Sequence, residues 1–256
     1  EGPDETLTET LNAQPAIFAA SIALLRCLAL PEDVAFVAGH SVGEYSALVA
    51  ADAMRFEDAL RLVQERGRLM HHAGTEMRGG MQAVMGLDDL AIEAACEAVA
   101  PLIVCPANYN APGQTIISGE EAALEAVESE LKARGAKRVI RLNVSAAFHS
   151  PVMTGAAAQL RQAIERVPIR APRWPVVGNV SSQPLRTEAD LRQELAEQIA
   201  APVRWEASVR AMLAAGVTRF LEIGPGKVLT GMLRRIDPAA EAQNVTDLPS
   251  LHALAG

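Results

Sequence analysis

The sequence predicts an α/β fold in which a parallel-sheet core is interrupted by a small ferredoxin-like subdomain. Two observations lead to this prediction. Apolar runs of strand length alternate with segments of helical periodicity along the chain. In the middle, the predicted elements follow the order βαββαβ, which is that of the split βαβ unit. We therefore place the core at residues 1–77 and 146–256 and the small subdomain at 78–145.

In the first part of the core, the sequence predicts a strand between helices. Residues 14–28 leave few polar faces and predict a buried helix, and the apolar run "DVAFVAG" at 33–39 predicts a buried parallel strand. Helices are expected at about 41–51 and 56–72. A strand, a tight turn and a helix in succession are the setting in which a nucleophilic serine can be exposed.

The alternation of predicted strands and helices continues through the small subdomain and the last part of the core. In the subdomain we expect strands at 81–87, 102–108, 114–119 and 136–144, and helices at 88–100 and 120–135. Afterwards we expect strands at 174–180 and 218–224, helices at 151–167, 187–200 and 203–215, and a final helix after "PGK". The tail from Asp237 onward is expected to be less regular.

Composition excludes several classes of protein. The net charge of −8 argues against a general nucleic-acid binder. The apolar runs are too short to cross a bilayer, and the first residues do not have the pattern of a signal peptide. Cys27, Cys96 and Cys105 are scattered and without CxxC spacing, which favours neither disulfides nor zinc. These features predict a cytoplasmic protein without membrane segments.

The candidate nucleophile is Ser41, at the centre of the Gly-x-Ser-x-Gly sequence at 39–43. A serine at such a turn can be exposed, and the N-terminus of the following helix would favour a developing negative charge there. A serine hydroxyl also needs a neighbouring base. The alternative is an ordinary turn, because Gly and Ser are both common in turns.

Among the five histidines, His149 is the best candidate for this base. It follows a predicted strand and precedes a helix that begins at Pro151, and strand ends are where α/β folds place functional residues. The side chain of His40 should point away from that of Ser41. His71 and His72 lie near a helix end, where a structural role is expected. A structural role for His149 stays open from its position alone.

Arg66 lies on or beside the apolar stripe of the helix at 56–72, near Leu62 and Leu69. Arginine is rarely buried without a partner. One interpretation is a side chain that reaches solvent or forms a buried ion pair. The other is a planar guanidinium that binds the carboxylate of a ligand.

Several longer segments resemble one enzyme family. "GHSVGEYSALVAA", Arg66-Gly67, "NAPGQTIISG", "AFHSPVM", "PVVGNV", "APVRW" and "EIGPGKVLTGM" occur in the order seen in malonyl-CoA:acyl-carrier-protein transacylases. The resemblance extends from about residue 10 to residue 236. It implies a hydrolase-like α/β core with a ferredoxin-like insert. It also implies transfer of a malonyl group from malonyl-CoA to acyl carrier protein, for fatty-acid or polyketide synthesis.

The resemblance also implies roles for individual residues. Ser41 matches the nucleophile, His149 the general base and Arg66 the residue that binds the malonyl carboxylate. Val42 matches the backbone N–H of the oxyanion hole, and Gln198 the position whose backbone carbonyl orients the histidine. No metal or bound cofactor is implied, since the coenzyme A thioester and phosphopantetheine enter as substrates.

Two further features concern selectivity and completeness. Phe148 resembles the residue of malonyl-selective members, and it would fill the space that an α-methyl branch needs. Such a difference of one methyl is worth only about 1–3 kcal/mol. The N-terminal strand and "PGQG" loop of the family, whose glutamine amide completes the oxyanion hole, have no counterpart in this sequence.

A basic segment at 132–141 could contact the acidic carrier protein. It contains five cations and no acid: Lys132, Arg134, Lys137, Arg138 and Arg141. Electrostatic steering would favour such a docking patch, although a solvated helix end is the ordinary interpretation.

Two other functions remain open from the sequence. A serine esterase or thioesterase could use the same turn, but such enzymes usually carry an acid between serine and histidine in chain order. A catalytically silent module that binds or docks acyl groups is the second.

Overall fold

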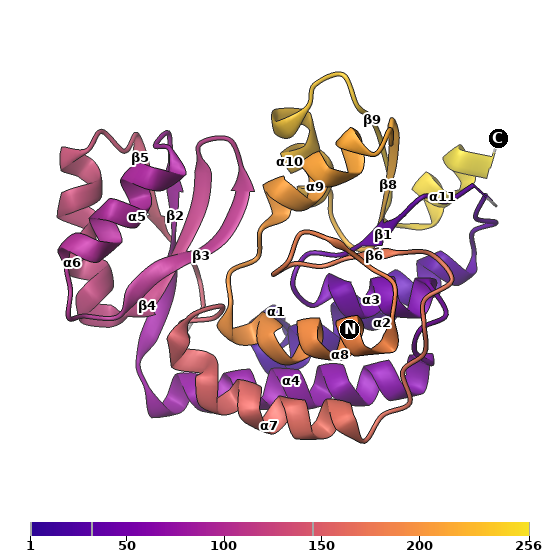
Figure 1. Cartoon of the computed structure of the whole chain (residues 1–256), viewed down its shortest axis with the longest axis horizontal. Coiled ribbons are helices and arrows are strands. Elements are labelled where there is room, and N and C mark those ends of the chain that lie inside the picture. Colours follow the sequence, from indigo (N-terminus) through magenta and orange to yellow (C-terminus); the bar gives the residue numbers. More distant parts are fainter. Residues whose placement is uncertain (1, 32, 145, 256) are drawn as a thin grey trace.

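The structure, a computed structural model, describes residues 2–31, 33–144 and 146–255. Figure 1 shows two parts side by side: a small subdomain from the middle of the chain and a larger core from its two ends. The expected helices and strands occur in the predicted order, together with further short elements at 4–8, 184–185, 241–245 and 248–255, and the strands pair both in parallel and antiparallel. The predicted α/β fold class with a small subdomain is confirmed.

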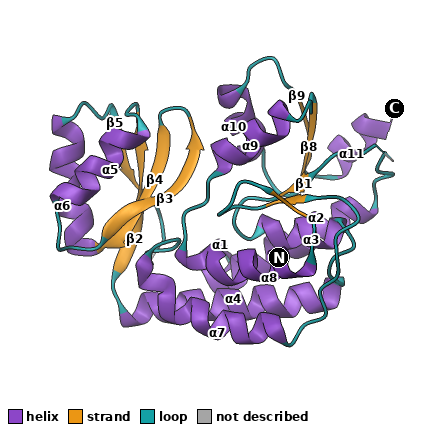
Figure 2. Ribbon diagram, in the orientation of Figure 1, coloured by secondary structure: helices purple, strands orange, loops and turns teal. Residues whose placement is uncertain are grey.

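The small subdomain is built on a four-stranded antiparallel sheet with the order β3-β4-β2-β5. Both of its helices cover one face of this sheet (Figure 2), and Val84, Ile92 and Leu124 are among the residues buried between them. The elements are β2 (Gly79–Met85), α5 (Asp89–Ala98), β3 (Val104–Ala111), β4 (Gln114–Glu120), α6 (Glu121–Ala133) and β5 (Arg138–Arg141). We propose domain boundaries before residue 78 and after residue 145, which itself lies outside the described residues.

The first half of the core carries the segment that later forms the site. It contains α1 (Asp4–Thr8), α2 (Thr10–Arg26), β1 (Val37–Ala38), α3 (Gly43–Ala50) and α4 (Phe56–Glu76). The expected strand at 33–39 is therefore too long by five residues. Only Val37 and Ala38 pair with a neighbouring strand, β6, and this pairing is parallel.

The second half of the core completes two small sheets, with the strand orders β1-β6-β7 and β8-β9. Its elements are α7 (Thr154–Glu165), β6 (Val176–Val177), β7 (Pro184–Leu185), α8 (Glu188–Glu197), α9 (Trp205–Ala214), β8 (Arg219–Ile223), α10 (Val228–Ile236), β9 (Glu241–Val245) and α11 (Leu248–Ala255). The 3-10 turns η1 (Pro151–Met153) and η2 (Gln198–Ala200) precede α7 and follow α8.

The tail contradicts the expectation of irregular structure after Asp237. β9 pairs in parallel with β8 over five residues, and α11 follows it. The β9 sequence "EAQNV" has only isolated apolar residues. Its strand conformation comes from pairing with β8, which a local pattern does not reveal.

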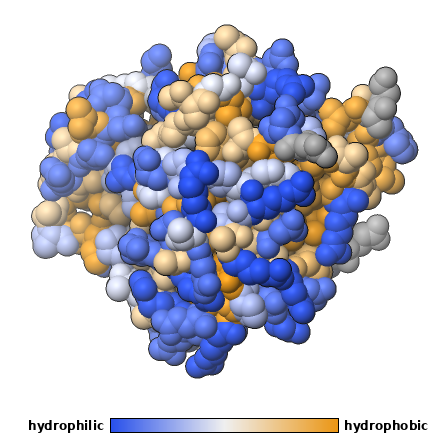
Figure 3. All heavy atoms as spheres, turned by 45° about the vertical axis from the view of Figure 1, so that its right-hand side comes forward, coloured by the Kyte–Doolittle hydropathy of each residue, from blue (hydrophilic) through white to orange (hydrophobic). Residues whose placement is uncertain are grey.

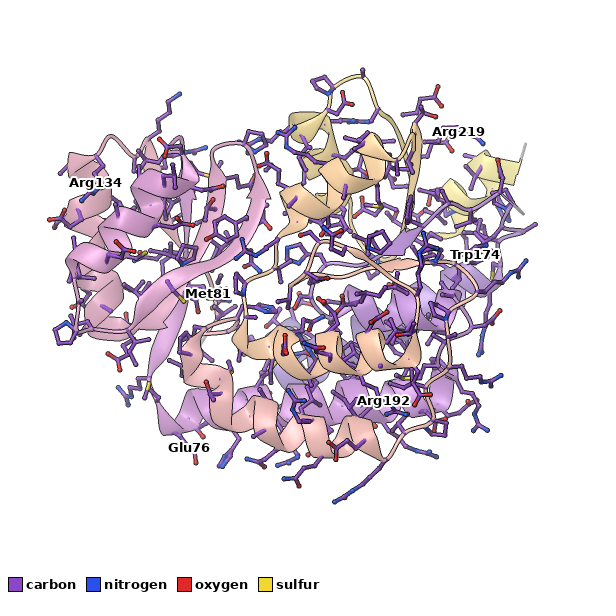
Figure 4. All side chains as sticks on the ribbon, in the orientation of Figure 1. Glu76, Met81, Arg134, Trp174, Arg192 and Arg219 are labelled. Atoms are coloured by element: carbon purple, nitrogen blue, oxygen red, sulfur yellow. The ribbon has the colours of Figure 1, made fainter. Side chains whose placement is uncertain are left out.

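One hydrophobic cluster spans the two parts of the molecule. The largest buried cluster joins core residues such as Phe18 and Leu160 to Met81 and Ile116 of the small subdomain. Figure 4 shows Met81 where the two parts meet. In Figure 3, polar side chains cover much of the visible face and hydrophobic ones gather toward its right side. No helix within the described residues is long and apolar enough to span a membrane.

Candidate active site

Ser41 lies in a sharp turn between β1 and α3. Its φ of +53° is in the left-handed region, which is uncommon for a residue other than glycine. Gly39 is required for this turn, because a Cβ there would lie 2.0 Å from the carbonyl carbon of Gly43. The strained turn projects the Ser41 hydroxyl beyond the end of the strand. Such strain is typical of functional positions.

His149 is brought to Ser41 from the connection between β5 and η1. Its Nε2 lies 2.8 Å from Ser41 Oγ, and its Nδ1 lies 2.9 Å from the backbone oxygen of Gln198 and 3.2 Å from that of Ala201. Carbonyl oxygens only accept hydrogen bonds, so the Nδ1 atom carries the proton. Nε2 is then the acceptor that faces the serine hydroxyl. The sequence did not single out Ala201 as a second backbone partner.

The environment of His149 keeps its ring neutral. Burial, and to a smaller extent the positive charge of Arg66, lower the pKa of His149 from 6.5 to about 3, although the hydrogen bonds to backbone carbonyls oppose the shift. A neutral imidazole can accept a proton from Ser41 at neutral pH.

We expect the His149 ring to stay neutral on acidification through the range in which histidine ordinarily titrates. The unfolded chain takes up this proton near pH 6.5 and the folded chain only near pH 3, so the contribution to folding stability falls as the pH drops below 6.5. NMR of histidine-labelled protein measures the ring directly, and the signal missing from His149→Ala assigns it. A protonation midpoint near 6.5 would contradict this prediction.

Arg66 reaches the same point from the interior face of α4. Its Nη2 donates to Ser41 Oγ at 2.9 Å and to Gln198 Oε1 at 2.9 Å, and its Nη1 donates to Gln14 Oε1. The side chain cannot reach solvent, because the residue is only 1% exposed. Within the described part of the chain it forms no salt bridge, and its Nε has no hydrogen-bond partner. Neither structural interpretation of Arg66 fits this environment.

Val42 follows Ser41 in the sequence, and Phe148 precedes His149. Val42 precedes the first residue of α3, and its N–H makes no hydrogen bond to the described residues. Phe148 is buried in the main core cluster. Its effect on an α-methyl branch stays a prediction.

Three further residues of the site were not singled out by the sequence. Gln14 of α2 is buried and contacts Arg66, and Asn179, which follows β6, accepts the N–H of Ser41 at 2.7 Å. Glu44, in the first turn of α3, accepts hydrogen bonds from Asn179 and from the Gln198 side chain. Two of them lie in segments that carry the family resemblance, Glu44 in "GHSVGEYSALVAA" and Asn179 in "PVVGNV".

The remaining histidines stay outside this group. His40 Nε2 lies 2.9 Å from Asn110 Oδ1, and its ring packs against Trp205. His72, near the end of α4, lies 3.4 Å from a carboxylate oxygen of Glu76. His40 therefore makes no hydrogen bond to Ser41 among the described residues.

The five predicted docking cations lie on α6, on β5 and between them. Lys132 pairs with Glu128, Arg134 with Glu130 and Arg141 with Glu121. Figure 4 shows Arg134 on the outer side of the small subdomain, away from the core. These ion pairs offset most of the positive charge and weaken the case for a docking patch, which stays a prediction.

Comparisons with known proteins agree with this geometry. The family described as "Acyl transferase domain" matches residues 1–253. The malonyl CoA-acyl carrier protein transacylase of Salmonella typhimurium is 42% identical, over 99% of this chain and 83% of that protein.

Solved structures extend the likeness to the fold. An acyl carrier protein S-malonyltransferase from Vibrio cholerae has a TM-score of 0.93 at 41% identity, covering 99% of this chain and 84% of that one. A type II PKS acyl-carrier protein in complex with its malonyl-transacylase gives 0.94 at 42% identity, with 99% and 83% covered. The chain therefore belongs to the acyl transferase family and, within it, to the malonyl CoA-acyl carrier protein transacylases.

Proposed function

We propose that this protein transfers a malonyl group from malonyl-CoA to the phosphopantetheine thiol of acyl carrier protein, through a malonyl ester of Ser41. The observation that carries the proposal is the buried guanidinium of Arg66. It lies 2.9 Å from the candidate nucleophile and forms no salt bridge with the described residues. A buried cation beside a nucleophile suits an acyl group that brings its own carboxylate.

In the first half-reaction, Ser41 Oγ attacks the thioester carbonyl while His149 Nε2 takes its proton. Negative charge develops on the carbonyl oxygen, and in this proposal the N–H of Val42, the residue before α3, stabilises it. The carbon–sulfur bond then breaks, and His149 returns the proton to the coenzyme A thiolate. The carbonyl groups at Nδ1 hold the ring in the required tautomer throughout.

In the second half-reaction, the phosphopantetheine thiol of the carrier gives its proton to His149 and attacks the malonyl ester. The bond from Ser41 Oγ to the acyl carbon breaks, and His149 returns the proton to the serine. The chemistry draws on these side chains and the two substrates, without a resident metal or cofactor. The relatives' names, which join malonyl CoA to acyl carrier protein, support this pair of substrates.

Three outcomes distinguish the candidate functions. The protein is incubated with labelled malonyl-CoA, with and without carrier protein. Stable labelling followed by transfer supports the transacylase. Release of free malonate would indicate a serine hydrolase, and absence of labelling a silent binding module.

Arg66→Ala should remove the preference for malonyl over acetyl groups. Hydrogen bonds to charged groups are worth roughly 1.5–3 kcal/mol each, so malonyl loading should fall by about one to two powers of ten. When acetyl-CoA binds the native protein, the Arg66 guanidinium has no carboxylate partner, which disfavours acetyl loading. Arg66→Ala removes the guanidinium and with it this unfavourable free energy. The measurement is the ratio of malonyl to acetyl loading rates on Ser41.

Arg68→Ala is the matched control, because Arg68 lies on the exposed side of α4 and pairs with Glu65. It should leave the loading ratio unchanged. If Arg66→Ala slowed both acyl groups by the same factor and lowered thermal stability, Arg66 would be structural and the carboxylate-binding role wrong.

We also propose a preference for malonyl over methylmalonyl groups through Phe148, a supply role in fatty-acid or polyketide synthesis, and a cytoplasmic location. The buried position of Phe148 supports the first, and the malonyl transacylase relatives support the second. The free thiols of Cys27, Cys96 and Cys105 support the third.

A further inference from the structure

Glu44 is a buried carboxylate held by amides. It is 0% exposed, in the first turn of α3. Its Oε1 accepts from the backbone N–H of Asn179 at 3.0 Å and from Asn179 Nδ2 at 3.1 Å, and its Oε2 accepts from Gln198 Nε2. No salt bridge to Glu44 occurs among the residues that the structure describes. Burying a carboxylate this way is costly, so its contacts suggest a role beyond packing.

The two amide residues that Glu44 contacts also hold the backbone of Ser41. Asn179 Oδ1 accepts the Ser41 N–H at 2.7 Å, and Gln198 Nε2 donates to the Ser41 carbonyl oxygen at 3.0 Å. Both main-chain groups of the strained residue are thus bonded to side chains that Glu44 contacts. Asn179 Nδ2 also donates to Gly39 O at 2.7 Å, on the preceding side of the turn.

An amide side chain can be rotated by half a turn, which exchanges its donor and its acceptor. Burial raises the pKa of Glu44, but both of its carboxyl oxygens accept from these amides, so the group selects the rotation in which both NH₂ groups face it. In that rotation, Asn179 presents its oxygen to the Ser41 N–H. Gln198 presents its oxygen to Arg66 Nη2, 2.9 Å away. The backbone oxygen of the same Gln198 accepts from His149.

We propose that Glu44 is a positioning residue for the acyl transfer reaction. Through Asn179 and Gln198 it fixes the conformation of the Ser41 turn and the place of the Arg66 guanidinium. The proposal rests on the proposed function, because it takes Ser41 as the nucleophile. Glu44 itself does not touch the reacting atoms. Its effect should appear in the rate of the chemical step more than in the binding of malonyl-CoA.

Glu44→Gln tests this role with little change in volume. The new NH₂ group must face one of the amide donors, which forces Asn179 or Gln198 to rotate. We expect the single-turnover rate of Ser41 malonylation to fall by about 10- to 100-fold, since small misplacements at a reacting centre cost up to about 10²-fold. The malonyl-CoA concentration giving half the maximal rate should change by less than about threefold.

Glu194→Gln is the matched control. Glu194 is also buried, and its carboxylate accepts from the backbone N–H groups of Val180 and Ser181, not from a side chain that touches Ser41. A merely structural role predicts that both variants lose thermal stability while their loading rate constants stay native. That result would overturn the proposal, whereas slow loading confined to Glu44→Gln would support it. Absence of loading in the native protein would instead refute the proposed function.

A second pair of variants keeps the test valid if Glu44→Gln folds poorly. Asn179→Asp keeps the oxygen that accepts from Ser41 but turns a second oxygen toward Glu44, and should slow loading by a similar factor. In the double variant Glu44→Gln/Asn179→Asp, the new amide can donate to the new carboxylate, and the loading rate should recover at least partly. A double variant no faster than Asn179→Asp alone would overturn the proposal.

Discussion

Ser41→Ala is expected to abolish covalent loading by malonyl-CoA while leaving the fold intact. Alanine keeps the Cβ and the backbone N–H that donates to Asn179, so the turn loses only the Oγ contacts with His149 and Arg66. Without the oxygen, no ester can form. The measurement is the intact mass after exposure to malonyl-CoA, in which the native protein gains one malonyl group.

Ser46→Ala provides the control, since Ser46 lies on the same helix, α3, and its hydroxyl makes no hydrogen bond to the described residues. It should load like the native protein. Thermal unfolding of the three proteins should agree closely. If Ser41→Ala still acquired a malonyl group, the nucleophile would be another residue, and the proposed roles of His149 and Arg66 would fail with it.

The sequence predicted the catalytic pair because both residues lie in local patterns. Ser41 is marked by its flanking glycines, and the structure shows the steric reason at Gly39, where only glycine fits. His149 was selected by its position after a strand and before Pro151. The 2.8 Å distance between the two side chains could not be predicted from the sequence, since they are 108 residues apart.

The sequence leaves three roles open for the Arg66 side chain, and the structure excludes two of them. Its position beside an apolar stripe allowed a solvent-reaching side chain, a buried ion pair or a ligand-binding group. Burial excludes the first, and its neighbours Gln14 and Gln198 are neutral amides rather than carboxylates. Those neighbours come from α2 and from the turn after α8, so helical periodicity around Arg66 carries no information about them.

Glu44 and Asn179 were not predicted as site residues, because no local sequence pattern marks their roles. Glu44 at the start of a helix ordinarily indicates a solvated acid that favours the helix dipole, which predicts exposure rather than complete burial. Asn179 follows the two-residue strand β6, which forms by pairing with β1 on one side and β7 on the other. The roles of Glu44 and Asn179 therefore depend on tertiary contacts. The same holds for strand β9, which forms by pairing with β8 and has few apolar residues.

His149→Ala should slow loading of Ser41 by about 10²–10⁴-fold, the usual contribution of a general acid–base residue. The substitution removes the acceptor for the Ser41 proton and the donor that returns it to the leaving thiol. The effect is smaller than that of Ser41→Ala because the nucleophile and the guanidinium of Arg66 remain. The measurement is the single-turnover rate of malonylation at neutral pH.

Backbone strain must be separated from the loss of the base, because His149 has a φ of +55°. His149→Asn keeps a residue that tolerates the left-handed region, and it should be as slow as His149→Ala. Exogenous imidazole should partly restore loading in His149→Ala, since the vacated space lies between Ser41 and the backbone oxygen of Gln198. His40→Ala is the control and should load at nearly the native rate. A near-native rate in His149→Ala, together with slow loading in His40→Ala, would move the base to His40.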